Sequence, residues 1–334
     1  MNILLTSVGR RSYLVKYFKQ AIGESGIVVA ANSDPLTSGM IVADKAYTVP
    51  KVNSDHYIDE LLGICKKEKI SLVLSLFDID LPYLSKARSR FEDIGVTLVV
   101  SEPWLIETAN DKWKTYNFLL ENNVPTPQTF LKLDDVKNAI QQGQLNYPVI
   151  VKPRWGMGSI SVFKAENQKE LEFFFDYAQK EIEKSYLSIL SISELHQSVI
   201  VQQMITGKEY GLDVFNNLQG KHLQTIIREK ISMRSGETDM ARIIENSAIS
   251  GLGNQLANIC KHIGNMDVDV LEDKDGKMYI LEMNVRFGGG YPFSHIAGAN
   301  YPNALIAMAK GENPVLGNIK IGCIGMKNIE MLEA

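Results

Sequence analysis

Two carboxylates within residues 269–290 are spaced so that a β-hairpin would bring them together. Asp275 and Gly276 separate two apolar runs, a pattern typical of a two-residue hairpin turn. With these two residues as the turn, Asp269 lies directly opposite Glu282. Such neighbours are roughly 5 Å apart at Cβ, where like charges repel. The pair therefore predicts a cation between the two carboxylates.

The strand that contains Glu282 offers a polar face. Because side chains alternate along a strand, Glu282, Asn284 and Arg286 share this face. The opposite face is expected to enter a core through Leu281, Met283 and Val285. Carboxylate and amide oxygens suit Mg²⁺, which proteins usually hold with one or two carboxylates and the phosphates of a substrate. A solvated surface hairpin is the alternative interpretation.

The bulk composition excludes several classes of function. The 334 residues suffice for two or three domains. A net charge of −4 and a pI of about 5.8 argue against broad binding to nucleic acids or anionic membranes. Cys65, Cys260 and Cys323 fit no zinc spacing, which indicates reduced thiols and a cytoplasmic protein. No stretch approaches the ~20 apolar residues of a membrane span.

Residues 1–100 alternate between short apolar runs and helical patterns. We expect strands at 3–5, 27–31, 72–76 and 96–100 and helices at 9–23, 57–67 and 81–91. This alternation predicts an α/β fold in which helices cover both faces of a parallel sheet.

Two loops follow strands at the edge where such sheets collect ligands. They are residues 6–11 and residues 77–80. The first has only Gly9 where a dinucleotide site has several spaced glycines, so we do not infer NAD binding. Ordinary loop chemistry is an equal alternative for both loops, and whether those at Gly9 and Asp78 touch a substrate is left open.

Residues 124–127 break the pattern with two prolines, which predicts an extended linker at a domain boundary. Before it, Asn110 or Asp111 can cap a new helix. Beyond it we expect strands at 149–153, 159–164, 198–204, 210–215 and 223–230 and helices at 167–184 and 251–263. Thr206 and Gly207 read as a turn between two of these strands, for which a plain hairpin is the favoured interpretation.

A lysine and two glycines after the strand 149–153 form a candidate anion site. Lys152 supplies a point charge, and Gly156, Gly158 and Ser159 offer backbone N–H groups that can surround a phosphate. The spacing differs from a P-loop. A surface lysine is the alternative for Lys152. Further along, Gln202 ends a strand that could present its edge to a flat base, and Glu209 could accept hydrogen bonds from a ribose.

Taken in order, these segments resemble the ATP-grasp superfamily, and within it the carbamoyl-phosphate-synthetase-like branch. The match covers nearly the whole chain, although the chain has one ATP module and is too short for a full carbamoyl phosphate synthetase. The resemblance implies an N-terminal Rossmann-like domain at 1–110, a helical lead-in and small central α+β subdomain at 111–205, and a C-terminal subdomain with the Mg²⁺ site at 206–334.

The resemblance also implies roles for single residues. ATP phosphates would be contacted by Lys112 and Lys152 and covered by a loop of Gly156, Gly158 and Ser159. Adenine and ribose would be contacted by Gln202, by the backbone of Gln203, Met204 and Ile205, and by Glu209. Mg²⁺, or alternatively Mn²⁺, would be held by Asp269, Glu282 and Asn284. Two departures are Val285, where the family usually has proline, and Gln202, where glutamate is common.

The chemistry implied is a carboxylate–amine ligase, in which ATP converts a carboxylate into an acylphosphate that an amine then attacks. Lys152 and Arg286 would neutralise the transferred phosphoryl group. Arg234, in the charged run 228–238, could pair with a phosphate or a substrate carboxylate, or lie in a solvated loop. His295 could face the acceptor or be structural. The substrates would be small molecules, and a homodimer is common among similar proteins.

Two other functions stay open at this point. One is an ATP-dependent carboxylase, and the other is a nucleotide-binding protein without catalysis. Retention of Asp269, Glu282, Asn284 and both lysines argues against the second.

Overall fold

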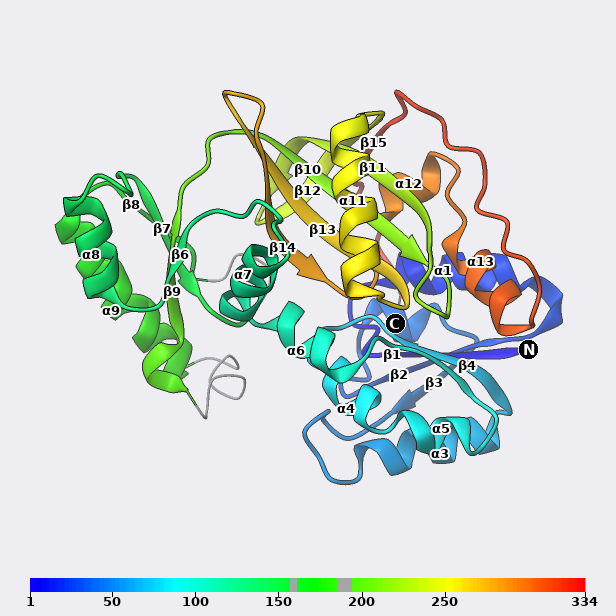
Figure 1. Ribbon diagram of the computed structural model, residues 1–334. Coiled ribbons are helices and arrows are strands. Elements are labelled where there is room, and N and C mark those ends of the chain that lie inside the picture. Colours follow the sequence, from blue (N-terminus) through cyan, green and yellow to red (C-terminus); the bar gives the residue numbers. More distant parts are fainter. Residues whose placement is uncertain (157–160, 185–193, 334) are drawn as a thin grey trace.

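The computed structural model describes residues 1–156, 161–184 and 194–333, and three sheets organise them (Figure 1). The first is a parallel five-stranded sheet in the order β3-β2-β1-β4-β5. Its strands are β1 (Asn2–Thr6), β2 (Val28–Asn32), β3 (Lys45–Thr48), β4 (Ile70–Ser75) and β5 (Thr97–Val99). The α/β prediction is confirmed, but β3 was not predicted, because this short edge strand is largely exposed and lacks an apolar run.

Helices cover both faces of the parallel sheet. They are α1 (Ser12–Ile22), α2 (Ser38–Ile41), α3 (Tyr57–Lys67), α4 (Leu81–Lys86), α5 (Arg88–Glu92) and α6 (Pro103–Asn110), with a short 3₁₀ turn at Gly23–Ser25. Because side chains alternate along β1, Ile3 and Leu5 enter one buried cluster with α1, whereas Leu4 enters another with α3 and α4.

The central sheet is antiparallel, in the order β6-β9-β7-β8, and carries its own helices. Its elements are β6 (Thr129–Phe130), α8 (Leu133–Gln141), β7 (Val149–Pro153), β8 (Phe163–Ala165), α9 (Gln168–Lys184), a 3₁₀ turn at Leu195–Gln197 and β9 (Val199–Gln203). Helix α7 (Lys112–Glu121) leads into it. Figure 1 shows α8 and α9 on the far side of this sheet from the rest of the protein.

The third sheet is antiparallel, in the order β14-β13-β10-β11-β12-β15. Its strands are β10 (Gly207–Asn216), β11 (His222–Arg234), β12 (Glu237–Ile244), β13 (Gly264–Asp273), β14 (Met278–Asn284) and β15 (Ile324–Met326). The accompanying helices are α11 (Ser247–Cys260), α12 (Tyr291–Ile296) and α13 (Tyr301–Ala309). No helix in the described ranges is both long and apolar enough to cross a membrane.

The predicted hairpin around Thr206 and Gly207 is wrong. β9 pairs with β6 and β7, whereas β10 pairs with β11 and β13, so these two strands belong to different sheets. A turn signal between two apolar runs does not distinguish a hairpin from a crossing between sheets. The predicted division at residues 110 and 205 stays a prediction.

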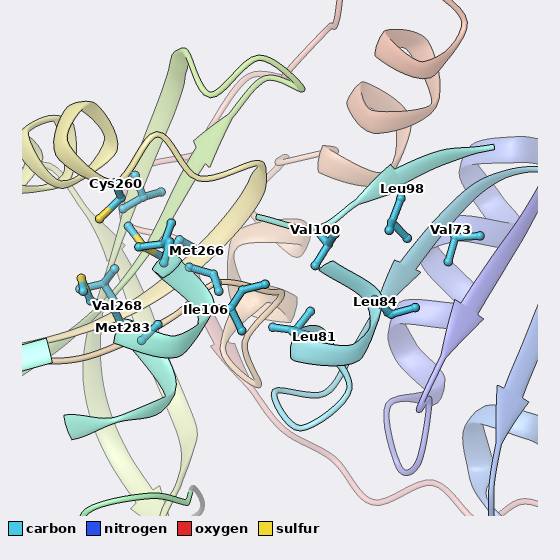
Figure 2. Close-up of a cluster of buried hydrophobic side chains, with 14 of the residues drawn as sticks. Val73, Leu81, Leu84, Leu98, Val100, Ile106, Cys260, Met266, Val268 and Met283 are labelled. Carbon is cyan, nitrogen blue, oxygen red and sulfur yellow. The ribbon is translucent and has the colours of Figure 1, made fainter. Parts of the chain in front are cut away.

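Hydrophobic packing joins the first and third sheets but leaves the central sheet with a core of its own. Figure 2 shows Val73, Leu84 and Leu98 of the N-terminal part in the same buried cluster as Met266, Val268 and Met283 of the third sheet, with Leu81 and Ile106 between them. A second cluster joins α1 and β1 to α12 and α13. Among the described residues, the buried members of the central cluster lie between 136 and 201, and the half-buried Phe130 and Leu133 pack against them.

Candidate active site

A pocket of about 300 Å³ lies between the central and third sheets. Strands β7 and β9 form one wall, and β10, β11, β13 and β14 form the other. The predicted nucleotide and metal residues that line it are Lys112, Lys152, Gly156, Gln202, Gln203, Met204, Ile205, Glu209, Asp269 and Glu282. Gly158 and Ser159 lie outside the described residues. The fold therefore brings together residues as far apart in the chain as Lys112 and Glu282.

Lys152 is a buried cation without a carboxylate partner among the described residues. Its Nζ donates to Gln202 Oε1 at 2.7 Å, and Gln202 Nε2 donates to Thr129 Oγ1 at 2.9 Å. The side chain is only 7% exposed. Burial, together with the nearby charge of Lys112, lowers the pKa of Lys152 to about 8, although the charges of Glu282 and Asp269 act in the opposite direction. An anion in the pocket would supply the missing counter-charge.

Lys112 owes its position to a buried ion pair that the sequence analysis missed. Asp111 caps α7 by accepting from the N–H groups of Trp113 and Lys114. Both Asp111 oxygens also bind the Arg154 guanidinium, at 2.8 and 2.7 Å, with each side chain only 3% exposed. The Lys112 N–H donates to Arg154 O at 3.1 Å, and its Nζ donates to Gly156 O at 2.6 Å.

The chain crosses between the two walls of the pocket at residues 203–207. Gln203, Met204 and Ile205 line the pocket immediately after β9. Gly207 then begins β10 with φ +156°, and a Cβ there would lie 1.9 Å from Glu272 O. Only glycine fits this close approach, which keeps the start of β10 against Glu272 of β13.

A second residue that the sequence analysis missed is Lys230 on β11. Its Nζ donates to Glu209 Oε1 at 2.6 Å and to Asp269 Oδ1 at 2.7 Å, and the side chain is almost fully buried. These two carboxylates raise the pKa of Lys230 even though burial opposes them. The predicted strand ends at Lys230, but β11 continues to Arg234 and pairs with β12 through a tight turn. Ser235 and Gly236, both with positive φ, were the available turn signal.

The predicted register of the acidic hairpin is confirmed, since Asp269 lies opposite Glu282. The path to it differs from the prediction. The loop has three residues instead of two, because Asp273 N–H bonds to Lys277 O, and a bulge at Leu281 restores the register. The predicted burial of Leu281 is therefore wrong.

The bulge places Leu281 on the same side as Glu282, where both line the pocket, and Ile280 enters the core instead. Burial, together with the charges of Asp267 and Glu282, raises the pKa of Asp269 to about 6, although Lys230 acts in the opposite direction. Two facing carboxylates whose charges repel each other fit the usual Mg²⁺ arrangement of one or two carboxylates plus phosphates. Asn284 lies opposite Asp267 and does not line the pocket.

Arg286 and Arg234 do not line the pocket. Arg286 is buried against Asp78, which accepts from its Nε at 2.8 Å. Arg234 is 68% exposed at the β11–β12 turn, with Nη2 3.5 Å from Asp239 Oδ2. His295 stacks on Tyr17 with ring centroids 3.6 Å apart, which places it between α1 and α12.

The family comparisons match this geometry. Residues 109–290 match the ATP-grasp domain model, and residues 3–99 match the model of the PylC-like N-terminal domain. A carbamoyl-phosphate synthase from Methanobrevibacter smithii is 25% identical over 324 residues, which cover 93% of this chain and 81% of that protein.

Solved structures show the same fold. The biotin carboxylase domain of the 2-oxoglutarate carboxylase from Hydrogenobacter thermophilus, crystallised with MgADP, ADP and bicarbonate, superposes with a TM-score of 0.74 at 18% identity, covering 96% of this chain and 72% of that one. An L-amino acid ligase from Bacillus licheniformis superposes with a TM-score of 0.71 at 18% identity, covering 96% and 78%.

This chain belongs to the ATP-grasp family. The predicted superfamily and the predicted similarity to carbamoyl phosphate synthetases are both confirmed. The structural neighbours include a ligase and a carboxylase, so the fold is compatible with either reaction.

Proposed function

We propose that the protein is an ATP-dependent carboxylate–amine ligase. It activates a carboxylate as an acylphosphate, joins it to an amine, and releases ADP and phosphate. The observation that carries the proposal is the arrangement of charge across one pocket. Lys112 and Lys152 make no ion pair with a described carboxylate, and they share this pocket with Asp269 and Glu282. A nucleotide with its metal ion complements both sets of charges.

The residues on the two walls have separate tasks in this proposal. Lys112 and Lys152 bind phosphate oxygens, where a dry site makes each charge more effective than it would be in water. Gln202 to Ile205 bind the base, and Glu209 binds the ribose. Asp269 and Glu282, with Asn284 as the third predicted ligand, hold Mg²⁺ or alternatively Mn²⁺. When bound, the metal ion neutralises charge on the phosphoryl group.

The proposed contacts of Arg286 and Arg234 with the substrates each require a side chain or loop to move. Arg286 follows directly from the metal-binding strand, but its guanidinium is engaged with Asp78, so contact with the phosphoryl group requires a changed side-chain position. Arg234 is exposed at a hairpin tip whose neighbours Met233 and Gly236 line the pocket. Its proposed contact with phosphate or substrate therefore depends on movement of that tip.

Phosphate release from Mg-ATP tests the proposal. The protein is incubated with pairs drawn from amino acids, dipeptides, small carboxylic acids and amines. Release that requires both members of one pair, with transfer of ¹⁸O from the carboxylate to phosphate, supports a ligase. Glu282→Ala is expected to abolish release. Asp275→Ala, an exposed carboxylate on the same hairpin, is the matched control and is expected to leave it unchanged.

Two other results would contradict the ligase proposal. Release that requires bicarbonate, with ¹³C-bicarbonate carbon appearing in the product, would identify a carboxylase. Binding of Mg-ATP without turnover with any pair or with bicarbonate would identify a nucleotide-binding protein. Sedimentation of the same samples tests whether the chain forms a homodimer.

A further inference from the structure

A second group of charged side chains, buried or half-buried, lies where the parallel sheet meets the third sheet. Arg11 follows β1, and Asp78 follows the neighbouring strand β4, so both lie at the carboxyl edge of the parallel sheet. Asp267 of β13 and Arg286 after β14 face them from the third sheet. None of these four side chains lines the nucleotide pocket.

Asp78 makes an incomplete ion pair. Arg286 Nε and Nη2 both reach the same Asp78 oxygen, Oδ2, at 2.8 and 2.6 Å. The other oxygen, Oδ1, is buried and has no hydrogen-bond partner. Arginine–carboxylate pairs commonly use both oxygens, and an unsatisfied buried polar atom is destabilising. One acceptor on a nearly buried carboxylate therefore lacks a donor.

Arg11 has donor groups that no protein acceptor uses among the described residues. Its Nη1 donates to Phe287 O, and no described residue accepts from its Nε or Nη2. Asp78 and Asp267 are near enough to act on Arg11 through charge, and the like charge of Arg286 opposes them. Arg11 and Tyr13 are half-buried beside the exposed Arg10, so solvent reaches this region along the loop after β1.

We propose that this region binds the amine substrate as a zwitterion, with Asp78 Oδ1 accepting from its ammonium group and Arg11 donating to its carboxylate. The substrate class is a free α-amino acid or a peptide with a free N-terminus and a nearby carboxylate. A molecule with both charges supplies a donor to Asp78 and an acceptor to Arg11, and it leaves the net charge of the region unchanged. This inference rests on the proposed ligase function for its role in the reaction, but the binding itself does not require turnover.

Binding is tested first, without ATP, by equilibrium dialysis of the full chain against radiolabelled alanine, glutamate, lysine and phenylalanine. Each amino acid is compared with its N-acetyl form and with the amine that lacks the α-carboxylate. We expect at least one free amino acid to bind, and both altered forms to bind on the order of 10–100-fold more weakly, because each loses one charge-assisted hydrogen bond.

Variants test which residues are responsible. Arg11→Met is expected to raise the Kd of the amino acid on the order of 10–100-fold while leaving that of the carboxylate-free amine unchanged. Asp78→Asn is expected to weaken both, and Asp78→Glu to restore part of the binding. Arg10→Met, in the exposed part of the loop after β1, and Asp59→Asn, at an exposed position of α3, are the controls and should change neither Kd.

The outcomes separate this inference from the proposed function. If carboxylate-free amines bind or react as well as amino acids, or if Arg11→Met weakens both equally, the zwitterion site is rejected while ligase activity stands. If no acceptor stimulates phosphate release, the ligase proposal fails and dialysis alone decides on the site. Dialysis with no binding of any amino acid, together with turnover of another amine, would reject the site outright.

Discussion

The third sheet has two borders, and they are built differently. Toward the parallel sheet, two buried hydrophobic clusters cross the border, and charged groups such as Arg286 and Asp78 are paired within it. Toward the central sheet lies a polar pocket in which Lys152 is buried with only a neutral partner. The first border is stabilised mainly by its apolar contacts, whereas at the second border the ammonium group of Lys152 makes no ion pair with a described carboxylate.

The difference indicates which border is permanent. Separating the parallel and third sheets would expose large apolar clusters, at a cost of about 25 cal/mol for each Å². The central sheet instead has a separate core and is attached through few polar contacts, among them Asp111–Arg154 and the hydrogen bond from Ile280 N–H to Pro125 O at 2.8 Å. Opening of the pocket is therefore expected to move the central sheet and not the parallel sheet.

The largest effect is expected from breaking the attachment of the central sheet. Arg154→Met leaves Asp111 as a buried, unpaired carboxylate, which should lower the free energy of unfolding by about 3–5 kcal/mol. Urea unfolding measures this change. Arg90→Met removes an exposed arginine that pairs with Asp59 and is the control. Equal effects of the two substitutions would contradict a structural role for the buried pair.

Matched leucine truncations test whether the two cores are separate. Leu105 and Leu171 are both fully buried, the first in the shared core and the second in the central core. Each leucine-to-alanine change should cost about 2–5 kcal/mol. Hydrogen exchange is expected to show faster opening of both the parallel and third sheets in Leu105→Ala, but of the central sheet alone in Leu171→Ala. Faster exchange throughout the protein in both variants would show a single cooperative core.

Burial of the protonated Lys152 is expected to lower the free energy of unfolding of the protein. Because its pKa is about 8 when folded and near 10.5 in the unfolded chain, folding disfavours the protonated form. This cost is fully present below pH 8 and declines as the pH rises toward 10.5. Lys152→Met should therefore raise the free energy of unfolding at neutral pH by up to about 3 kcal/mol and remove the gain in stability above pH 8.

Urea unfolding at several pH values measures the effect of Lys152→Met, and the exposed Lys169→Met is the control. The same substitution should weaken nucleotide binding. A variant that is no more stable than the parent at neutral pH would show that the ammonium is not a net cost.

The smallest change in stability is expected at Thr129, which ends the hydrogen-bond chain from Lys152 through Gln202. Thr129→Val keeps the shape of the side chain but leaves Gln202 Nε2 without its acceptor, at a cost of about 1 kcal/mol. Thermal unfolding measures the loss, and Thr108→Val on the exposed side of α6 is the control. A larger drop in nucleotide affinity than in stability would show that Gln202 is positioned for the base.

Local patterns were sufficient where structure is local. Four of the five parallel strands were predictable because their apolar runs are continuous, whereas β3 has no such run. The Asp269–Glu282 pair was predictable because a turn signal lies close to both residues. Arg154 was missed because its partner Asp111 lies 43 positions earlier, and the Asp78–Arg286 pair because its members are 208 positions apart. No periodic pattern records which loop of one sheet meets which strand of another, so these contacts came only from the structure.

The bulge at Leu281 makes the acidic pair insensitive to slippage at the hairpin tip. With a three-residue loop and a bulge, or with a two-residue loop and none, Asp269 faces Glu282 in either case. The outer half of the hairpin can therefore change its pairing by one residue without moving Asp269 and Glu282, the two proposed metal ligands. Substitutions near Asp275 are therefore not expected to change the positions of Asp269 and Glu282. Residues 274–276 are a suitable place to insert a probe or a tag.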